Sequence, residues 1–156
     1  MNVRTMALDR KGDYKMLKIP LTQPEILAAL GKAGHGSKVL IADGDYPVST
    51  TRGKNASIVH LNLSAGVVTC VQVLEVMLPV LLVEAVVVMD VPRGHPKPSI
   101  WKDYSKLIKE NCGNLTMKKV ERFKFYKEVG SDNTALIVQT GDLSEYANIL
   151  LTIGSL

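Results

Sequence analysis

Short runs of Val, Leu and Ile, separated by polar and amphipathic stretches, constrain the fold more than any other feature of this sequence. Three such runs are residues 39–42, 83–91 and 135–140. They have the length and the β-branched content of buried strands. Residues 100–111 carry their aromatic and aliphatic side chains at helical spacing, which predicts an amphipathic helix that ends at Gly113. This alternation predicts an α/β fold in which helices flank a central sheet.

Weaker signals complete the pattern. The segment Thr22-Gln23-Pro24-Glu25 has the form of a capping box and predicts a short helix that ends at Gly34. Residues 49–55 are polar and predict a loop, and Pro79 predicts a bend or a break. We further expect strands at 58–63 and 120–129 and a helix at 68–74.

The length and composition fit one domain. A chain of 156 residues with 46% hydrophobic content can bury a substantial core without disulfides or a metal. Residues 1–16 indicate a leader or an extended N-terminus, and the domain proper is expected at 17–156. The first residues lack an apolar segment followed by a cleavage site, so we expect a cytoplasmic protein.

Composition also argues against several partners and cofactors. The longest apolar stretch, 67–91, is interrupted by Glu75, Pro79 and Glu84, so no membrane span is expected. The net charge of +4 arises mostly before Ile19, and no basic stripe with aromatic residues predicts nucleic-acid binding. The three histidines and two cysteines lack metal-ligand spacing, and no dinucleotide or P-loop fingerprint occurs. We therefore expect neither a metal nor a cofactor.

Two residues near the first predicted strand could carry chemistry. His35 lies between two glycines, and an imidazole is the side chain that ordinarily exchanges protons near neutral pH, as a proton-transfer group must. Asp43 follows the strand 39–42 and opens a cluster of turn residues, at the edge where open α/β sheets place ligands. The alternative interpretations are a surface or helix-capping histidine and an aspartate that forms an Asx turn.

Other polar residues lie beside apolar segments and suit hydrogen bonding to a polyhydroxyl ligand. They are Arg122, Tyr126, Tyr146 and Asn148. Each could equally be a solvated or strand-edge residue. His60, within an apolar alternation, is expected to be packed, and His95 to be a loop residue.

Three ordered motifs resemble the L-fucose mutarotase and D-ribose pyranase family. The first is Gly34-His35-Gly36 followed by an apolar strand into Asp43. The second is Glu121-Arg122-Phe123-Lys124-Phe125-Tyr126, and the third is Thr140-Gly141 leading to Tyr146-Ala147-Asn148. The resemblance extends from about residue 17 to 154, nearly the whole domain.

The resemblance implies a role for each of these residues. His35 matches the proton-transferring histidine of the family, Asp43 its substrate-binding aspartate, and Tyr126 a tyrosine implicated in the fucose branch. Arg122 and the segment formed by Tyr146, Ala147 and Asn148 match sugar contacts. Mutarotation needs one group to protonate the ring oxygen and another to deprotonate the anomeric hydroxyl, and it requires no cofactor. Asp43 is expected to orient His35 or to hold a sugar hydroxyl.

The resemblance leaves the sugar and the branch open. The string from Glu121 to Tyr126 and the tryptophan-bearing helix resemble the fucose branch, which favours L-fucose as substrate. Ser49-Thr50-Thr51-Arg52 resembles the ribose branch, so a D-ribose pyranase is the alternative, beside a non-catalytic monosaccharide-binding protein that assists transport. The resemblance also implies a homo-oligomer, a ring-shaped decamer with active sites at subunit boundaries.

Overall fold

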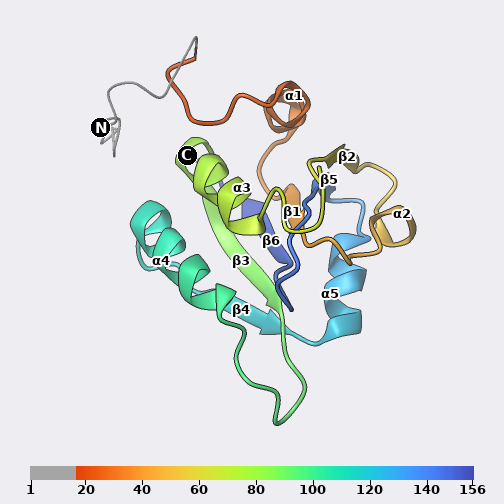
Figure 1. Cartoon of the computed structure of the whole chain (residues 1–156). Coiled ribbons are helices and arrows are strands. Elements are labelled where there is room, and N and C mark those ends of the chain that lie inside the picture. Colours follow the sequence, from red (N-terminus) through yellow and green to blue (C-terminus); the bar gives the residue numbers. More distant parts are fainter. Residues whose placement is uncertain (1–16) are drawn as a thin grey trace.

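The computed structural model describes residues 17–156, so the expected leader at 1–16 lies outside the described residues. Its core is a six-stranded sheet with the order β2-β5-β1-β6-β3-β4 (Figure 1). The strands are β1 (Lys38–Ala42), β2 (Ser57–His60), β3 (Val83–Met89), β4 (Met117–Val120), β5 (Thr134–Gln139) and β6 (Ile149–Ile153). All are parallel except β6, which runs antiparallel to both β1 and β3.

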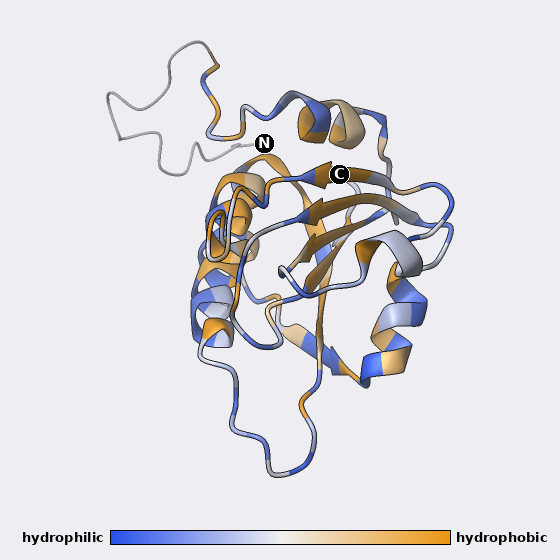
Figure 2. Ribbon diagram, turned by 45° about the vertical axis from the view of Figure 1, so that its right-hand side comes forward, coloured by the Kyte–Doolittle hydropathy of each residue, from blue (hydrophilic) through white to orange (hydrophobic). Residues whose placement is uncertain are grey.

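Helices cover both faces of this sheet. One face packs against α1 (Pro24–Lys32), α3 (Cys70–Met77), the 3-10 turn η1 (Leu78–Val80) and α4 (Ile100–Cys112). The other packs against α2 (Val48–Thr51) and α5 (Arg122–Val129). Successive residues of β1 alternate between the two layers, with Val39 and Ile41 on the first side and Leu40 and Ala42 on the second. Figure 2 shows the apolar strands between helices whose outer faces are hydrophilic.

These observations confirm the predicted α/β fold and most of its elements. The apolar runs at 39–42, 83–91 and 135–140 correspond to β1, β3 and β5, and the helix predicted at 100–111 is α4. That helix ends at Gly113, whose φ of +66° places it in the left-handed region that glycine tolerates. Pro79 lies in η1, where α3 ends.

The strand predicted at 120–129 is wrong, because β4 ends at Val120 and α5 follows. The Glu121 carboxylate accepts hydrogen bonds from the backbone N–H groups of Phe123 and Lys124, and so caps the first turn of a helix. Phe125 and Val129 are then buried one turn apart. An N-cap and an i, i+4 apolar pair therefore prevail over an apparent alternation.

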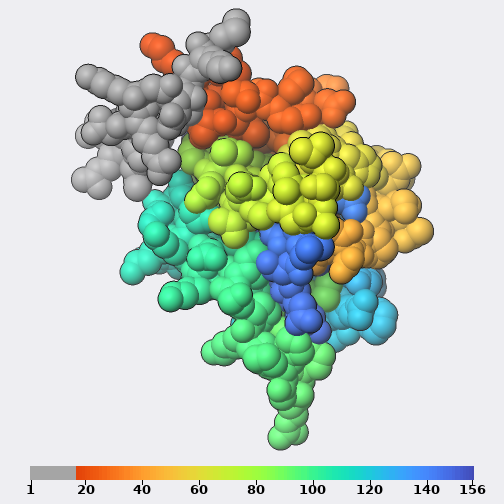
Figure 3. Space-filling view, in the orientation of Figure 1, coloured from red at the N-terminus to blue at the C-terminus, as the bar shows by residue number. Residues whose placement is uncertain are grey.

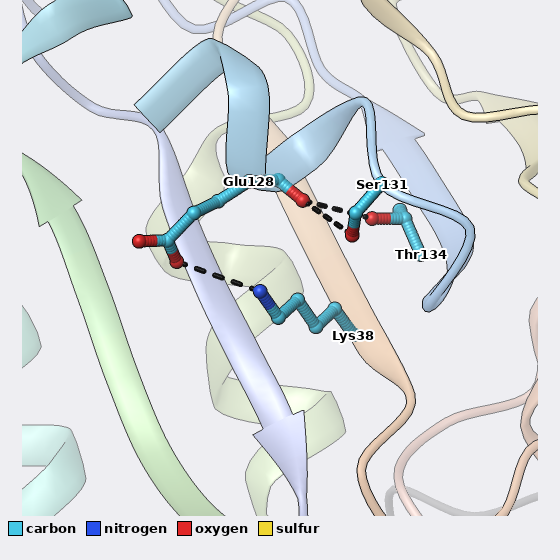
Figure 4. A network of polar contacts seen from close by, with 4 residues as sticks. All are labelled: Lys38, Glu128, Ser131 and Thr134. Atoms are coloured by element: carbon cyan, nitrogen blue, oxygen red, sulfur yellow. Dashed lines mark hydrogen bonds and ion pairs between the residues drawn. The ribbon is translucent and has the colours of Figure 1, made fainter. Parts of the chain in front are cut away.

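Polar contacts fix the far end of α5 against the sheet (Figure 4). Ser131 and Thr134 both donate to the backbone carbonyl of Glu128, at 2.8 and 3.5 Å, and the Glu128 side chain pairs with Lys38 of β1 at 3.5 Å. The helix is thereby anchored to β1 and β5. Its first turn lies at the opposite edge of the sheet, where Arg122 and Tyr126 are found.

Three smaller predictions also need correction. The polar segment 49–55 is a loop only in its second half, since α2 occupies Val48–Thr51. The N-cap of α1 is Gln23 rather than Thr22, because the Gln23 side chain accepts from the N–H of Ile26 at 2.6 Å. His60, expected to be packed, is exposed at the end of the edge strand β2.

Candidate active site

One edge of the sheet collects most of the predicted site residues. The carboxyl ends of the five parallel strands and the amino end of β6 meet there, on the lower side of Figure 1. Asp43 follows β1, Glu121 follows β4, and Asn148 precedes β6. We refer to this edge, with Asp43, Arg122, Tyr126 and Tyr146 to Asn148, as the carboxyl-edge cluster. It lies where ligands bind in open α/β sheets.

Asp43 is the buried acid of this cluster. Its side-chain carboxylate accepts from Asn148 Nδ2 at 2.7 Å, and its own backbone N–H donates to Asn148 Oδ1 at 3.0 Å. The other carboxylate oxygen accepts from the N–H of Asp45, so the Asx turn proposed as an alternative also forms. Burial raises the pKa of Asp43 from 3.8 to about 6, although these hydrogen bonds favour the charged form. The side chain can therefore both give and take a proton near neutral pH.

Tyr146 introduces the segment that crosses this edge. Its φ of +54° is unusual for a residue with a side chain, and neighbouring contacts hold it in place. The indole N–H of Trp101 donates to the Tyr146 carbonyl at 3.3 Å, and the Tyr104 hydroxyl donates to the Ala147 carbonyl at 2.5 Å. Ala147 itself is fully buried. Helix α4 therefore determines where Tyr146 and Asn148 lie.

Arg122 and Tyr126 form the third part of the cluster, on the first turns of α5. Arg122 Nε donates to the Tyr126 hydroxyl at 3.1 Å, and its guanidinium lies 5.5 Å from the centre of that ring. The hydrogen bond to Tyr126 raises the pKa of Arg122, and the nearby Tyr146 acts in the same direction. Tyr126 also packs edge-to-face on Tyr46, three residues beyond Asp43, at 5.4 Å. Arg122 and Tyr126 are neighbours because residues four apart lie on the same face of a helix, whereas in a strand they would be about 13 Å apart.

His35 does not join this cluster within the chain. It lies in the turn before β1, so the five residues of that strand, roughly 16 Å at the usual rise, separate it from Asp43. Its Nε2 lies 2.9 Å from Glu84 Oε2, and the His35 side chain is 58% exposed. The expectation that Asp43 orients His35 is therefore wrong for residues of one chain.

An open pocket of about 440 Å³ lies beside His35, at the amino edge of the sheet. Its polar lining residues include Lys32, Ser37, Asn55, Asp132 and Asn133. The two edges of the sheet thus carry different halves of the predicted chemistry: a histidine beside an open pocket at one, and at the other a buried acid with the residues predicted to contact a sugar.

The structure adds two residues that the sequence interpretation missed. Asp142 is buried after β5, where its carboxylate accepts from the N–H groups of Cys70 and Ser144, both at 2.8 Å, and so fixes the start of α3 and the loop toward Tyr146. The sequence could have indicated this role, because Thr140-Gly141-Asp142 directly follows the apolar strand β5.

His95, expected only to be a loop residue, contacts the carboxyl-edge cluster. Its loop, between β3 and α4, projects from the body of the molecule in Figures 1 and 3. The imidazole packs against the Tyr146 ring at 5.2 Å and lies 3.3 Å from the Glu145 carboxylate. No sequence spacing indicated this contact, because it depends on how a long loop folds back.

Within 17–156, no group of three or more His, Cys, Asp or Glu side chains is placed to hold a metal ion. Burial raises the pKa of the Cys70 thiol to about 12, so it remains protonated near neutral pH. Over the same part of the chain, the helices are too short or too polar to cross a membrane.

Comparison with known proteins finds one family throughout. A family model described as the RbsD / FucU transport protein family matches residues 16–156. A fucose mutarotase of Mus musculus is 33% identical over 142 residues, which cover 85% of this chain and 89% of the mouse protein. A D-ribose pyranase of Clostridium novyi is 27% identical over 139 residues, covering 89% and 98% of the two chains.

A solved structure agrees with these relatives. The fucose mutarotase of Streptococcus pneumoniae, determined in complex with L-fucose, superposes with a TM-score of 0.74 at 26% identity. The match covers 88% of this chain and 97% of the bacterial one.

Proposed function

The chain belongs to the RbsD / FucU transport protein family, and on that premise we propose that it is a sugar mutarotase. It is an isomerase that interconverts the anomers of a free aldose by opening and closing the ring, with L-fucose as the favoured substrate. The observation that carries this proposal is the carboxyl-edge cluster, in which a buried acid with a pKa of about 6 lies among hydrogen-bonding groups. A reversible reaction between anomers of similar free energy suits a group that gives and takes protons equally well.

The proposed reaction transfers two protons. His35 takes the proton of the anomeric hydroxyl, and the electron pair of that O–H bond forms the carbonyl at C1. The C1–O5 bond breaks, its electron pair goes to the ring oxygen, and Asp43 in its acid form protonates that oxygen. After rotation about the C1–C2 bond, closure runs the same steps in reverse and restores both groups. Tyr126 is the further candidate for carrying a proton, directly or through water.

The remaining residues of the cluster are proposed to hold the sugar. Arg122 offers N–H donors beyond the one it gives to Tyr126, and Asn148 offers a carbonyl and an amide that already face Asp43. Tyr146 supplies a phenol at the edge of the cluster. Ala147 contributes through its backbone, because its side chain is buried in the core. Directed hydrogen bonds of this kind fix the sugar relative to the proton-transfer groups.

The separation of His35 from Asp43 leads to a proposal about assembly. Each complete site takes His35 from one copy of the chain and the carboxyl-edge cluster from another. Exposed apolar side chains on loops and helix ends around the carboxyl edge support such a contact: Leu63, Phe123 and Leu143 are 83%, 72% and 66% exposed. A ring of ten copies, as the family resemblance implies, is the proposed form; a head-to-tail contact between different edges gives a ring when the rotation between successive copies closes.

A D-ribose pyranase is the alternative, supported by the ribose-like Ser49 to Arg52 segment. Its first three residues belong to α2 (Val48–Thr51), which follows Tyr46, and Tyr46 contacts Tyr126, so we propose that the segment borders the sugar pocket. A non-catalytic sugar-binding protein that assists transport would use the same pocket without accelerating exchange.

Saturation-transfer NMR of anomer exchange, with L-fucose, D-ribose and D-galactose, tests the proposal. We expect wild-type protein to accelerate exchange of L-fucose most and His35→Ala to abolish the acceleration. Fastest exchange with D-ribose would favour the pyranase instead. If the protein binds a sugar but does not accelerate anomer exchange, the mutarotase proposal is refuted and the transport-accessory function is favoured.

A further inference from the structure

The side chain of His35 is paired with Glu84, at the start of β3. His35 Nε2 and Glu84 Oε2 are 2.9 Å apart, within hydrogen-bond distance. Both side chains are accessible, at 58% and 43%, and an exposed pair of this kind contributes little to stability. The contact therefore calls for an explanation other than holding the fold together.

A β-bulge directs Glu84 toward His35. The pairing of β3 with β6 shifts register between Val83 and Ala85, which leaves Glu84 as the extra residue. A bulge bends the strand locally and changes the direction of a side chain, and bulges are frequent near active sites. Regular pairing would have continued the alternation of β3 without this change in direction.

Backbone hydrogen bonds hold both partners against the end of β6. Gly36 N–H donates to the Ile153 carbonyl at 2.8 Å, and Ile153 N–H donates to the Ser37 carbonyl at 2.9 Å. On the other side, Gly154 N–H donates to the Leu82 carbonyl at 2.9 Å. The turn that carries His35 and the strand that carries Glu84 are thus fixed to one shared element, so the distance between them is built into the fold.

From this geometry we infer that Glu84 is a positioning residue for His35, an inference that rests on the proposed function. A carboxylate that accepts from Nε2–H fixes the tautomer and the plane of the imidazole. Nδ1 then carries the lone pair, on a side chain that lines the open pocket, and is the atom that takes the anomeric proton. The carboxylate also stabilises the imidazolium that forms when this proton arrives.

Variants at Glu84 test the inference through kinetics. We expect Glu84→Ala and Glu84→Gln to lower kcat for anomer exchange roughly 10-fold, as loss of a group that orients a histidine does elsewhere, with KM changed less than about twofold. Glu75→Gln, which alters an exposed glutamate on α3, is the matched control and should leave both constants unchanged. A kcat for Glu84→Ala within about twofold of wild type would overturn the inference.

Nitrogen-15 NMR of the histidine rings provides a second readout that does not need activity. At pH 8.5, well above the ordinary imidazole pKa of about 6.5, wild-type His35 should show the Nε2–H tautomer, and Glu84→Ala a mixture. His35→Ala identifies the signal among the three histidines. A wild-type ring protonated on Nδ1 would contradict the inference. If the wild type exchanges no sugar, the proposed function fails, and the spectrum alone decides whether Glu84 orients His35.

Discussion

Replacing Asp43 by Asn should change how the stability of the protein depends on pH. Burial raises the pKa of Asp43 in the folded state from 3.8 to about 6. Between these values the folded state holds a proton that the unfolded chain has lost, so the free energy of unfolding falls as pH rises. At 1.36 kcal/mol per pKa unit the whole shift is worth about 3 kcal/mol; about 2.4 kcal/mol of it is lost between pH 4 and pH 7, and the Asp43 contribution is nearly constant above that.

An asparagine at this position cannot ionise, so Asp43→Asn should lack this contribution. The substitution has a cost of its own, because an amide group would face Asn148 Nδ2 where a carboxylate oxygen now accepts. Loss of one such buried hydrogen bond costs about 1 kcal/mol, and that cost does not vary with pH. The difference in stability between wild type and variant therefore isolates the titration of Asp43 from that of every other carboxylate.

Urea unfolding of both proteins between pH 4 and pH 8 measures this difference. Protein concentration must be held constant, because assembly of subunits adds to apparent stability. We expect the stability of wild type relative to Asp43→Asn to fall by about 2.4 kcal/mol across the range, with most of the change between pH 4 and pH 6. Parallel curves for the two proteins would refute a raised pKa at Asp43, and with it the role of that carboxyl as an acid near neutral pH.

Two further changes test the surroundings of the cluster. His95→Ala removes both the ring contact with Tyr146 and the pair with Glu145, whereas His95→Phe keeps a ring, so KM for L-fucose in the exchange assay should rise more in the alanine variant. Equal KM values in the two variants would show that the ring contact with Tyr146 does not affect KM. Gly141→Ala should lower the free energy of unfolding by about 2 kcal/mol or more, because the added Cβ would clash with the carbonyl oxygens of Ser64 and Val67. If the variant unfolds at the same urea concentration as wild type, the backbone at Gly141 does not approach Ser64 and Val67 so closely.

The sequence predicts β1, β3 and β5 clearly, whereas it did not indicate β4 or β6. β1, β3 and β5 are buried on both faces and appear as nearly continuous apolar runs, which are easily recognised. α5 was misassigned because only Phe125 and Val129 face the core, and the remaining residues give no clear helical period. Its start depends on the Glu121 side chain, whose capping hydrogen bonds outcompete the apparent alternation.

Individual site residues were predictable, but their arrangement was not. Asp43 lies after its strand as expected, since a strand end followed by turn residues is a local signal. The partnership of His35 with Glu84 depends on a bulge in β3, and that of His95 with Tyr146 on the path of a long loop. Both are contacts between segments far apart in sequence, which spacing within one segment cannot indicate.

Mixing two inactive variants tests most directly whether each site is shared between copies. His35→Ala lacks the proposed proton acceptor, and Asp43→Asn lacks the acid, so each alone should fail to accelerate exchange of L-fucose. If a site combines His35 of one copy with Asp43 of its neighbour, refolding the two variants together in equal amounts restores about a quarter of the sites. Recovery of about that share of wild-type activity is the predicted result. If the co-assembled rings of the two variants stay inactive, the proposal that each site is shared between copies is wrong.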